Sequence, residues 1–477
     1  MSAIVKDNTL YRFRSMDSLL GNKYQELERQ SIFFAPPESL NDPMEGFREV
    51  VFKGDGVLWG NLFKHYLASL MNIVQNYSII GENAYLDNRI QTLSPEEIIS
   101  EDLKECWREV KKTFFDDESI VSLIQTIADA DANVHQEELI VYLNVAHTFA
   151  LNCIIKQFLK INIGKVDISS LMNSLPKEDM IGKLIDVIRM MGKEKKREPG
   201  VDLLLQIFQC QTNQMLFMAE YNSGTQQPNK RLLIGGFPFA YVRKLEQLMY
   251  PNWFTACFMS KAANSSVWGN YGHNHSGACL MFDVELEHDN KYRLNLNDAG
   301  TDDDENIRER LPMLFHEIRY THKQDSLNFF ESIGQLPIPV INKQWLTNDN
   351  GVKSIYTSTF NEKWREKYWS DFYLPITQKS KDWEYENEYR LILNNAFGKH
   401  ERHGVTLNYD FKSLKGIIFG INTSYEHRFQ VVKIIERKVR ESGHFDFKFY
   451  QAYYCRHTGE IKNTELSLMK FTNSSAR

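Results

Sequence analysis

Near the start of the chain, apolar and polar residues alternate. Residues 9–14, Thr-Leu-Tyr-Arg-Phe-Arg, have the period of two that is typical of a half-buried strand, and this places Arg12 and Arg14 on one face. Ser15 is a suitable cap for a helix over residues 16–30, and the apolar run at 32–35 is stopped by two prolines. The pattern predicts a strand, a helix and a second strand.

Between residues 56 and 250 the spacing of apolar residues becomes helical. They recur every three to four positions, and strand alternation nearly vanishes. The stretches with this spacing are residues 58–75, 120–130, 138–163, 181–191 and 201–221. We expect a helical insertion whose apolar faces are fully used by helix packing.

Strand patterns return after residue 250. Strands are expected at residues 254–259, 278–283, 383–393, 414–419 and 445–454, and helices at residues 305–321, 359–371 and 427–442. The predicted fold class is α+β: a mixed, mainly antiparallel β-sheet core with flanking helices, interrupted by a large all-helical insertion. The expected boundaries are 1–55 and 251–465 for the two parts of the core, 56–250 for the insertion and 466–477 for a flexible tail.

Charge and hydropathy narrow the classes of partner. The 477 residues include 56 basic and 62 acidic side chains, for a net charge of −6, so no global positive field favours nucleic acid. The basic run at residues 193–197 is typical of a solvated helix end and leaves a local contact with nucleic acid open. No apolar run resembles a signal peptide or approaches a membrane span, so we expect a cytoplasmic protein without membrane contact.

Cysteine and histidine spacing does not predict a metal site. The six cysteines are scattered, without a CxxC pair, and are typical of reduced core thiols. His273 and His275 are two residues apart rather than the four of a helical zinc pair. We therefore expect no metal ligands at these positions.

Residues 383–393 concentrate acidic side chains. If they form a strand, Glu384, Glu386, Glu388 and Arg390 lie on one face. Three like charges on one face repel each other unless a cation meets them, and that cation is Arg390, Arg12, Arg14, a metal or a cationic ligand. A water-facing edge strand with scattered ion pairs explains the pattern equally well.

Two further segments carry groups suited to a site. Residues 257–260 bring a serine, Ser260, out of a buried strand, and the loop at 268–277 is rich in Trp, Tyr, His, Asn and Gly, which suit a small planar ligand. A packed loop with Trp268 in the core is the alternative. Asn41-Asp42-Pro43 has turn chemistry, and Asp42 and Glu45 are candidates to point into a cleft beside the glutamates.

Several motifs together resemble the DUF2971 family. They are Tyr11-Arg12-Phe13-Arg14, residues 32–36 and 41–45, residues 257–260, Trp268, Tyr271, His275, Gly277, Phe282-Asp283, Lys381, Trp383, Glu386, Glu388, Tyr389, Arg390 and residues 416–420. They span nearly the whole chain apart from residues 56–250. The resemblance implies an accessory protein of a bacterial defence or toxin system, and the family name itself records no reaction.

The Arg, Ser and Glu-x-Glu order is similar to the signature of ADP-ribosyltransferases. That resemblance implies NAD as substrate, with Arg12 or Arg14 on its phosphates, because a guanidinium makes bidentate bonds to phosphate oxygens. It further implies Ser260 beside the nicotinamide, Glu388 against the ribosyl cation and Glu386 at the acceptor. This chain departs from the pattern in lacking a Ser-Thr-Ser run after Phe258.

Within this hypothesis the catalytic residues are Glu388, Glu386 and Ser260. The residues expected to bind NAD or another nucleotide-type small molecule are Arg12, Arg14, Asn41, Asp42, Trp268, Tyr271, His275 and Arg390. Loss of the Glu388 charge is expected to abolish activity and to spare the fold.

Two other functions remain open at this stage. A Mg²⁺-dependent nuclease or phosphodiesterase would use Asp42, Glu45, Glu386 and Glu388 as hard oxygen ligands. A non-catalytic ligand-sensing module would recognise a ligand in the charged cleft and contact a protein partner through the helical insertion.

Overall fold

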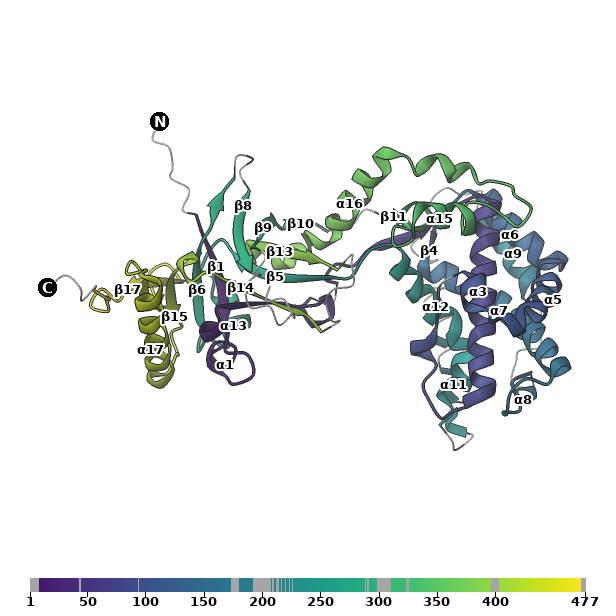
Figure 1. Cartoon of the computed structure of the whole chain (residues 1–477), viewed down its shortest axis with the longest axis horizontal. Coiled ribbons are helices and arrows are strands. Elements are labelled where there is room, and N and C mark those ends of the chain that lie inside the picture. The colour runs from purple at the N-terminus through teal and green to yellow at the C-terminus, as the bar shows by residue number, and fades with distance from the viewer. Residues whose placement is uncertain are drawn as a thin grey trace. The chain divides into compact units, whose positions relative to one another are not determined.

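The protein is described by a computed structural model (Figure 1), and it divides into two compact units. The structure describes residues 8–472 apart from residues 43, 93, 173–179, 192–206, 208, 209, 212, 213, 216, 219, 223, 225, 288, 290, 298–309, 323–325 and 396–402. The first unit, which we call the sheet unit, comprises residues 1–47, 251–324 and 373–477. The second, the helical unit, comprises residues 48–250 and 325–372.

The sheet unit contains twelve described strands in one sheet, in the order β17-β16-β15-β6-β1-β5-β13-β9-β8-β14-β2, with β7 paired to β8. The strands are β1 (Thr9–Arg14), β2 (Ser31–Phe34), β5 (Trp253–Met259), β6 (Ala278–Asp283), β7 (Glu285–Leu286), β8 (Tyr292–Asn297), β9 (Arg310–Glu317), β13 (Glu388–Asn394), β14 (Val405–Tyr409), β15 (Leu414–Phe419), β16 (Lys448–Cys455) and β17 (Glu460–Glu465). All pairings among these described strands are antiparallel except that of β15 with β16. Mixed α+β architecture with a mainly antiparallel sheet is therefore the fold class, as predicted.

Residues far apart in the chain form the centre of this sheet. β1 lies between β6 and β5, so the N-terminal strand is enclosed by strands that begin after residue 250 (Figure 1). A separate pair joins β10 (Arg319–Tyr320) to β12 (Gln378–Lys379) in parallel. After β2, Ala35 and Thr255 exchange backbone hydrogen bonds of 2.8 and 2.9 Å, which brings the segment that follows β2 beside β5.

Short helices flank the sheet. They are α1 (Met16–Leu20), α2 (Glu26–Arg29), η1 (Pro37–Ser39), α13 (Ser265–Asn270), η7 (Lys381–Glu386), η8 (Phe411–Ser413) and the longer α17 (Tyr425–Ser442). α17 contributes Val431, Ile435 and Val439 to the core that the sheet strands build. This apolar core holds the polar site residues of β1, β5 and β13 in place.

The helical unit is built around two long helices, α3 (Gly56–Ile80) and α7 (Gln136–Ile161). Its other helices are η2 (Asp87–Arg89), α4 (Pro95–Ile98), η3 (Glu101–Leu103), α5 (Lys104–Phe115), α6 (Glu118–Ala130), α8 (Ser169–Met172), α9 (Ile181–Met191), α11 (Pro228–Arg231), the π-helix η4 (Leu232–Gly236), α12 (Phe237–Leu245), η5 (Glu246–Leu248), α14 (Phe329–Ser332), α15 (Ile338–Gln344), η6 (Ile355–Thr359) and most of α16 (Glu362–Ile376). Four predicted helical stretches thus correspond to α3, α6, α7 and α9. The stretch at 201–221 and the basic run at 193–197 fall partly or wholly outside the described residues.

The helical unit differs from the expected insertion in two ways. It contains a small sheet of β11 (Ser326–Asn328), β3 (Glu49–Phe52) and β4 (Val134–His135), so it is not all helical. Residues 48–55 and 325–372 also belong to it, although they were expected in the core. Parallel pairing of β11 with β3 joins segments that are distant in the chain, and local periodicity carries no information about such pairing.

Other predicted elements need correction. The helix expected at 16–30 is broken into α1 and α2, with Gln25 in a left-handed conformation (φ 50°). The helix expected at 305–321 is wrong over its described part, because β9 and β10 occupy most of residues 310–320. Met313 and Phe315 are buried at a spacing of two, and this alternation was the available signal.

The tail and the cysteines also differ from expectation. Leu466, Met469 and Phe471 pack against the core, so the described part of the tail is not free of the sheet unit. Cys106, Cys153 and Cys279 are buried free thiols as expected, whereas Cys210 is exposed.

One described helix, α7, is long and apolar enough to cross a membrane by length and composition, although no such stretch was expected. In the most apolar 18-residue stretch of α7, 67% is buried inside the protein. The core helix of a soluble protein can have the same length and composition. A single helix of this kind is weak support for a membrane span.

A buried histidine joins α7 to α3. His147 Nε2 lies 2.6 Å from the Leu233 carbonyl oxygen, and His147 Nδ1 lies 2.6 Å from the Tyr66 hydroxyl. Because the carbonyl can only accept, the proton sits on Nε2 and Tyr66 donates to Nδ1. Burial lowers the pKa of His147 to about 4, so the ring is neutral in the folded protein.

We expect the helical unit to lose stability as pH falls from 6.5 towards 4. Folding lowers the pKa of His147 from 6.5 to about 4, so the unfolded chain binds this proton more readily. The free energy of unfolding therefore has its full value above pH 6.5 and falls by at most about 3 kcal/mol as the pH drops to 4. Hydrogen exchange of α7 peptides between pH 7 and 4 measures the loss. His147→Gln should remove this part of the pH dependence, and the exposed control His427→Gln should retain it. Equal pH dependence in wild type and His147→Gln would contradict the assignment.

Candidate functional site

A pocket of about 300 Å³ lies in the sheet unit, over β1 and β5. Its polar lining residues are Arg12, Arg14, Ser15, Ser18, Ser39, Asn41, Glu45, Thr255, Asn270, Tyr271, His273 and Lys379, and its apolar ones include Phe13, Phe33 and Met259. We call it the Arg12 pocket. A cavity of this size with several convergent polar groups is suited to part of a small ligand.

Arg12 is a buried cation at this pocket. Its Nη1 donates to the Cys257 carbonyl oxygen at 3.2 Å and its Nη2 to the Phe33 carbonyl oxygen at 3.0 Å. Its Nε is buried without a hydrogen-bond partner, and no described carboxylate forms an ion pair with this guanidinium. Burial lowers the pKa of Arg12 to about 10, and repulsion from Arg14 adds to this effect. The attraction of Glu26 offsets this burial only in part, and a buried guanidinium without an ion pair is costly, so an anion in the pocket would be stabilised there.

Arg14 lies two residues after Arg12 on β1, and its charge is paired with Glu26. Its Nε donates to Glu26 Oε2 at 2.7 Å, and its Nη2 forms a second bond to Glu26 Oε1. Glu26 belongs to α2, so the break after α1 is what brings this acid back over β1. Arg12 and Arg14, which were predicted to share a face, both line this pocket. Arg14 is paired with Glu26, whereas Arg12 forms no ion pair with a described carboxylate.

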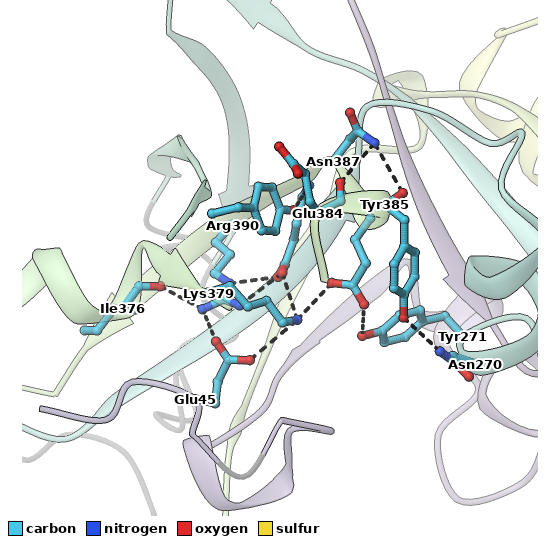
Figure 2. Close-up of polar contacts among 12 residues, drawn as sticks. Glu45, Asn270, Tyr271, Ile376, Lys379, Glu384, Tyr385, Asn387 and Arg390 are labelled. Atoms are coloured by element: carbon cyan, nitrogen blue, oxygen red, sulfur yellow. Dashed lines mark hydrogen bonds and ion pairs between the residues drawn. The ribbon is translucent and has the colours of Figure 1, made fainter. Parts of the chain in front are cut away.

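A cluster of five charged side chains adjoins the pocket, and two of its members, Glu45 and Lys379, line the pocket. It consists of Glu45, Lys379, Glu386, Glu388 and Arg390, and we call it the Lys379 cluster. Lys379 Nζ lies 2.8 Å from Glu386 Oε2, 3.3 Å from Glu388 Oε2 and 3.6 Å from Glu45 Oε2. Figure 2 shows Glu45 with contacts to both Lys379 and Arg390.

Arg390 completes the cluster from β13. It makes bidentate bonds to Glu388, at 2.7 Å from Nε and 3.0 Å from Nη2, and donates from Nη1 to the Ile376 carbonyl oxygen at 2.7 Å. The same Nη1 lies 2.5 Å from Glu45 Oε1, too poorly aligned for a hydrogen bond. Glu388 is therefore enclosed by Arg390 and Lys379, and its side chain is only 1% exposed.

Backbone turns deliver the three glutamates to this point. Asp42 Oδ1 accepts from the Met44 amide at 2.9 Å and its carbonyl from the Glu45 amide at 3.0 Å, a turn that directs Glu45 inward. Gly46 has φ 65°, and a Cβ there would collide with the ring of Trp253. Asn387 (φ 49°) ends η7 and starts β13, so Glu386 and Glu388 both reach Lys379.

The charges of the cluster are strongly coupled. Burial opposes ionisation of Glu388, but the charges of Arg390 and Lys379 outweigh it and lower the pKa of Glu388 to about 2. Burial raises the pKa of Glu386, which Lys379 offsets only in part, and burial likewise raises the pKa of Glu45. Three carboxylates face two cations, so the cluster carries one excess negative charge when all are ionised.

The loop after α13 contributes Tyr271 and His273 to the pocket, beside Asn270 at the end of that helix. Tyr271 donates its hydroxyl proton to Glu386 Oε1 at 2.7 Å (Figure 2). His273, Asn274 and His275 all have positive φ, between 49° and 65°, a conformation that side chains other than glycine seldom adopt. Gly277 permits this loop to lie against β1, because a Cβ there would collide with the Arg14 carbonyl oxygen.

The structure brings together many of the residues predicted for the site. Arg12, Arg14, Asn41 and Tyr271 line the pocket, while Glu386, Glu388 and Arg390 belong to the adjacent Lys379 cluster.

Other predicted residues are placed elsewhere. Asp42 serves the turn before Glu45, and Ser260 Oγ donates to the Asn387 carbonyl oxygen at 3.3 Å without lining the pocket. Trp268 is fully buried in the core, with its ring 4.9 Å from that of Phe13, as the packed-loop alternative held. His275 does not line the pocket, whereas His273 does.

The predicted strand at 383–393 is also corrected. Residues 381–386 form the 3-10 helix η7, because Ser380 Oγ caps the Asp382 amide and Asn387 turns left-handed. Glu384 is consequently exposed and leaves the face that Glu386 and Glu388 share.

Lys379 is the main residue that sequence reasoning missed. The motif drew attention to Lys381, which is exposed, while Lys379 is buried beneath the ring of Trp383, 4.7 Å from its centroid. Three acidic residues on one face predict a nearby cation, but β12 is only two residues long, so its sequence carries no strand pattern that points to Lys379. Its parallel pairing with β10 is a tertiary feature.

Within the described residues, no group of three or more His, Cys, Asp or Glu side chains is arranged to hold a metal ion. Glu45, Glu386 and Glu388 lie near one another, but each contacts Lys379 or Arg390. A cation bound there would have to displace these side chains.

The comparison with protein families identifies part of this region. Residues 267–391 match the family described as "Protein of unknown function (DUF2971)", the family that the sequence motifs resemble. The segment includes the α13 loop and most of the Lys379 cluster. No curated protein and no solved structure matches the chain.

We expect Glu388→Gln to destabilise the sheet unit, contrary to the expectation that it would spare the fold. It leaves Arg390 with a weakened buried partner, a loss of about 3–5 kcal/mol at neutral pH. Because the pKa of Glu388 is lowered from 4.5 to about 2, this stabilisation is present above pH 4.5 and is lost as pH falls towards 2. The difference between variant and wild type should therefore shrink in acid.

Chemical denaturation and hydrogen exchange of the peptide around β13 measure this effect. Glu384→Gln, an exposed neighbour, is the matched control and should change stability by less than about 0.5 kcal/mol. A Glu388→Gln protein as stable as the control would show that the ion pair contributes nothing to the fold.

Proposed function

We propose that the Arg12 pocket binds the phosphate groups of a nucleotide-type ligand and that this ligand is NAD. The observation that supports this most is Arg12 itself, a buried guanidinium that lines the pocket without a partner among the described carboxylates. Phosphate oxygens are the preferred acceptors of a guanidinium fork. Arg14 adds a second guanidinium on the same strand, held in place by Glu26.

The size of the pocket limits how much of NAD it encloses. At about 300 Å³ it lies at the lower end of small-molecule sites and suits one part of a dinucleotide. Ser39, Asn41 and Asn270 at its wall supply neutral hydrogen-bonding groups for ribose or amide atoms.

The proposed reaction is cleavage of the bond between nicotinamide and ribose, with transfer of the ADP-ribosyl group to an acceptor or to water. The bond breaks with both electrons going to the nicotinamide nitrogen, which leaves an oxocarbenium-like ribosyl cation. The excess negative charge of the Lys379 cluster would stabilise positive charge developing beside it. Glu386 is the carboxylate assigned to the acceptor, and Glu388 is reassigned to holding Arg390 and Lys379 in position.

A non-catalytic ligand-sensing module is the second candidate, and a specific observation favours it. The glutamates are internally paired and nearly inaccessible, with side chains that are 0–3% exposed, which is typical of a structural ion cluster. Under this function NAD or a related nucleotide binds the pocket and is released unchanged. A Mg²⁺-dependent nuclease is less well supported, because Glu45, Glu386 and Glu388 already contact cations.

An NAD-consuming activity suits an effector of a bacterial defence or toxin system acting in the cytoplasm, as the family resemblance implies. The trigger would then come from a protein partner at the helical unit.

We expect Arg12→Gln to weaken NAD binding by about 10- to 100-fold, because a hydrogen-bonded charge is lost. Isothermal titration calorimetry with NAD in the absence of divalent metal gives the affinity, and a parallel assay follows NAD loss. Inorganic pyrophosphate should compete, and binding should weaken with salt. Arg440→Gln on α17, whose side chain is 66% exposed, is the matched control and should bind as wild type does.

The outcomes separate the candidates. Binding with NAD consumption supports the enzyme, and binding without consumption supports the sensing module. Binding of Mn²⁺ or Mg²⁺ that Glu386→Gln abolishes would favour the nuclease. If neither NAD nor pyrophosphate binds the wild-type protein, the proposed function is wrong.

A further inference from the structure

We propose that Tyr271 is a catalytic residue that relays the acceptor's proton from the Arg12 pocket to Glu386. This inference rests on the proposed NAD cleavage and adds the route by which a proton leaves the reacting group. It assigns the acid–base step to a tyrosine–glutamate pair.

Glu386 has no direct access to the pocket. Its side chain is 0% exposed and is not part of the pocket lining. Tyr271 does line the pocket, and its hydroxyl donates to Glu386 Oε1 at 2.7 Å. The other carboxylate oxygen accepts from Lys379 Nζ at 2.8 Å, so Tyr271 links the buried acid to the pocket that it lines.

The position of Tyr271 is well determined by its surroundings. Its backbone amide donates to the Val267 carbonyl oxygen at 2.9 Å, and the neighbouring Trp268 anchors α13 in the core. Trp268 Nε1 donates to the Ala262 carbonyl oxygen at 2.9 Å. Tyr271 itself packs against the apolar cluster that contains Trp268, so its side chain needs little reorganisation to transfer a proton.

The step balances without any further reactant. As the bond from ribose C1′ to nicotinamide breaks, the acceptor oxygen, of water or a hydroxyl group, forms a bond to C1′. Its proton passes to Tyr271 Oη while the Tyr271 proton passes to Glu386 Oε1, so Tyr271 ends neutral and Glu386 protonated. The proton returns to solvent by the reverse path after product leaves. Burial, which raises the pKa of Glu386, makes it a better proton acceptor than an exposed carboxylate.

The neighbouring Tyr385 offers a matched control. Its hydroxyl accepts from Asn270 Nδ2 at 3.3 Å and has no hydrogen bond to a described carboxylate. Tyr385→Phe and Tyr271→Phe remove the same atom from two tyrosines that both lie near Asn270 (Figure 2). Only the second breaks the contact with Glu386.

We expect Tyr271→Phe to lower kcat for NAD cleavage by about 100-fold or more, the usual contribution of general acid–base catalysis. NAD affinity and the thermal midpoint should stay close to those of wild type, and Tyr385→Phe should retain wild-type kcat. The acid limb of the wild-type pH–rate profile should lie above pH 4.5, because the pKa of Glu386 is raised from that value, and it should vanish in Tyr271→Phe.

A double variant gives the sharpest test. If the two groups act as one relay, Tyr271→Phe combined with Glu386→Gln should be no slower than the slower single variant. Multiplied losses, or a Tyr271→Phe enzyme that keeps its rate and its acid limb, would overturn the relay while leaving NAD cleavage intact. A wild-type protein that never consumes NAD would instead overturn both proposals.

Discussion

Burial of the Lys379 cluster is the constraint on which the rest of the site depends. An unpaired charge inside a protein is costly, and the carboxylates that Lys379 and Arg390 meet offset this cost. Those carboxylates come from the turn after β2, from η7 and from β13. The ion pairs therefore hold three segments of the sheet unit together, and removal of one partner leaves the others uncompensated.

The same requirement distinguishes the pocket from the cluster beside it. Within the Lys379 cluster the charges compensate one another almost completely, whereas Arg12 is buried with only backbone carbonyls as its described hydrogen-bond partners. An unpaired buried guanidinium raises the energy of the empty protein and lowers it again when an anion arrives. The cost of an unpaired buried charge thus explains both the proposed affinity of the Arg12 pocket for an anion and the structural role of Glu388 beside Arg390.

Alternation at residues 9–14 and apolar runs later in the chain predicted several strands closely. β1, β6 and β15 have the expected bounds, since each is half-buried or buried along most of its length and pairs with regular neighbours. Prediction failed where alternation was read as helical spacing at β9, and where side-chain capping by Ser380 and a left-handed Asn387 replaced a strand with η7. At β9, pairing with β8 and β13 determined the structure, and at η7 the local hydrogen bonds did.

Sequence patterns alone were enough to predict the α+β class, most of the central strands, the family that residues 267–391 match and the need of clustered glutamates for a cation. The tertiary arrangement was needed to show that Lys379 and Arg390 supply that charge, that Arg12 forms no ion pair with a described carboxylate, and that Tyr271 rather than Trp268 or His275 lines the pocket. The reason is physical: charge pairing depends on distance and burial, which sheet order sets between segments far apart in the chain. Residue spacing along a strand reports which face a side chain takes, and it carries no information about what lies opposite.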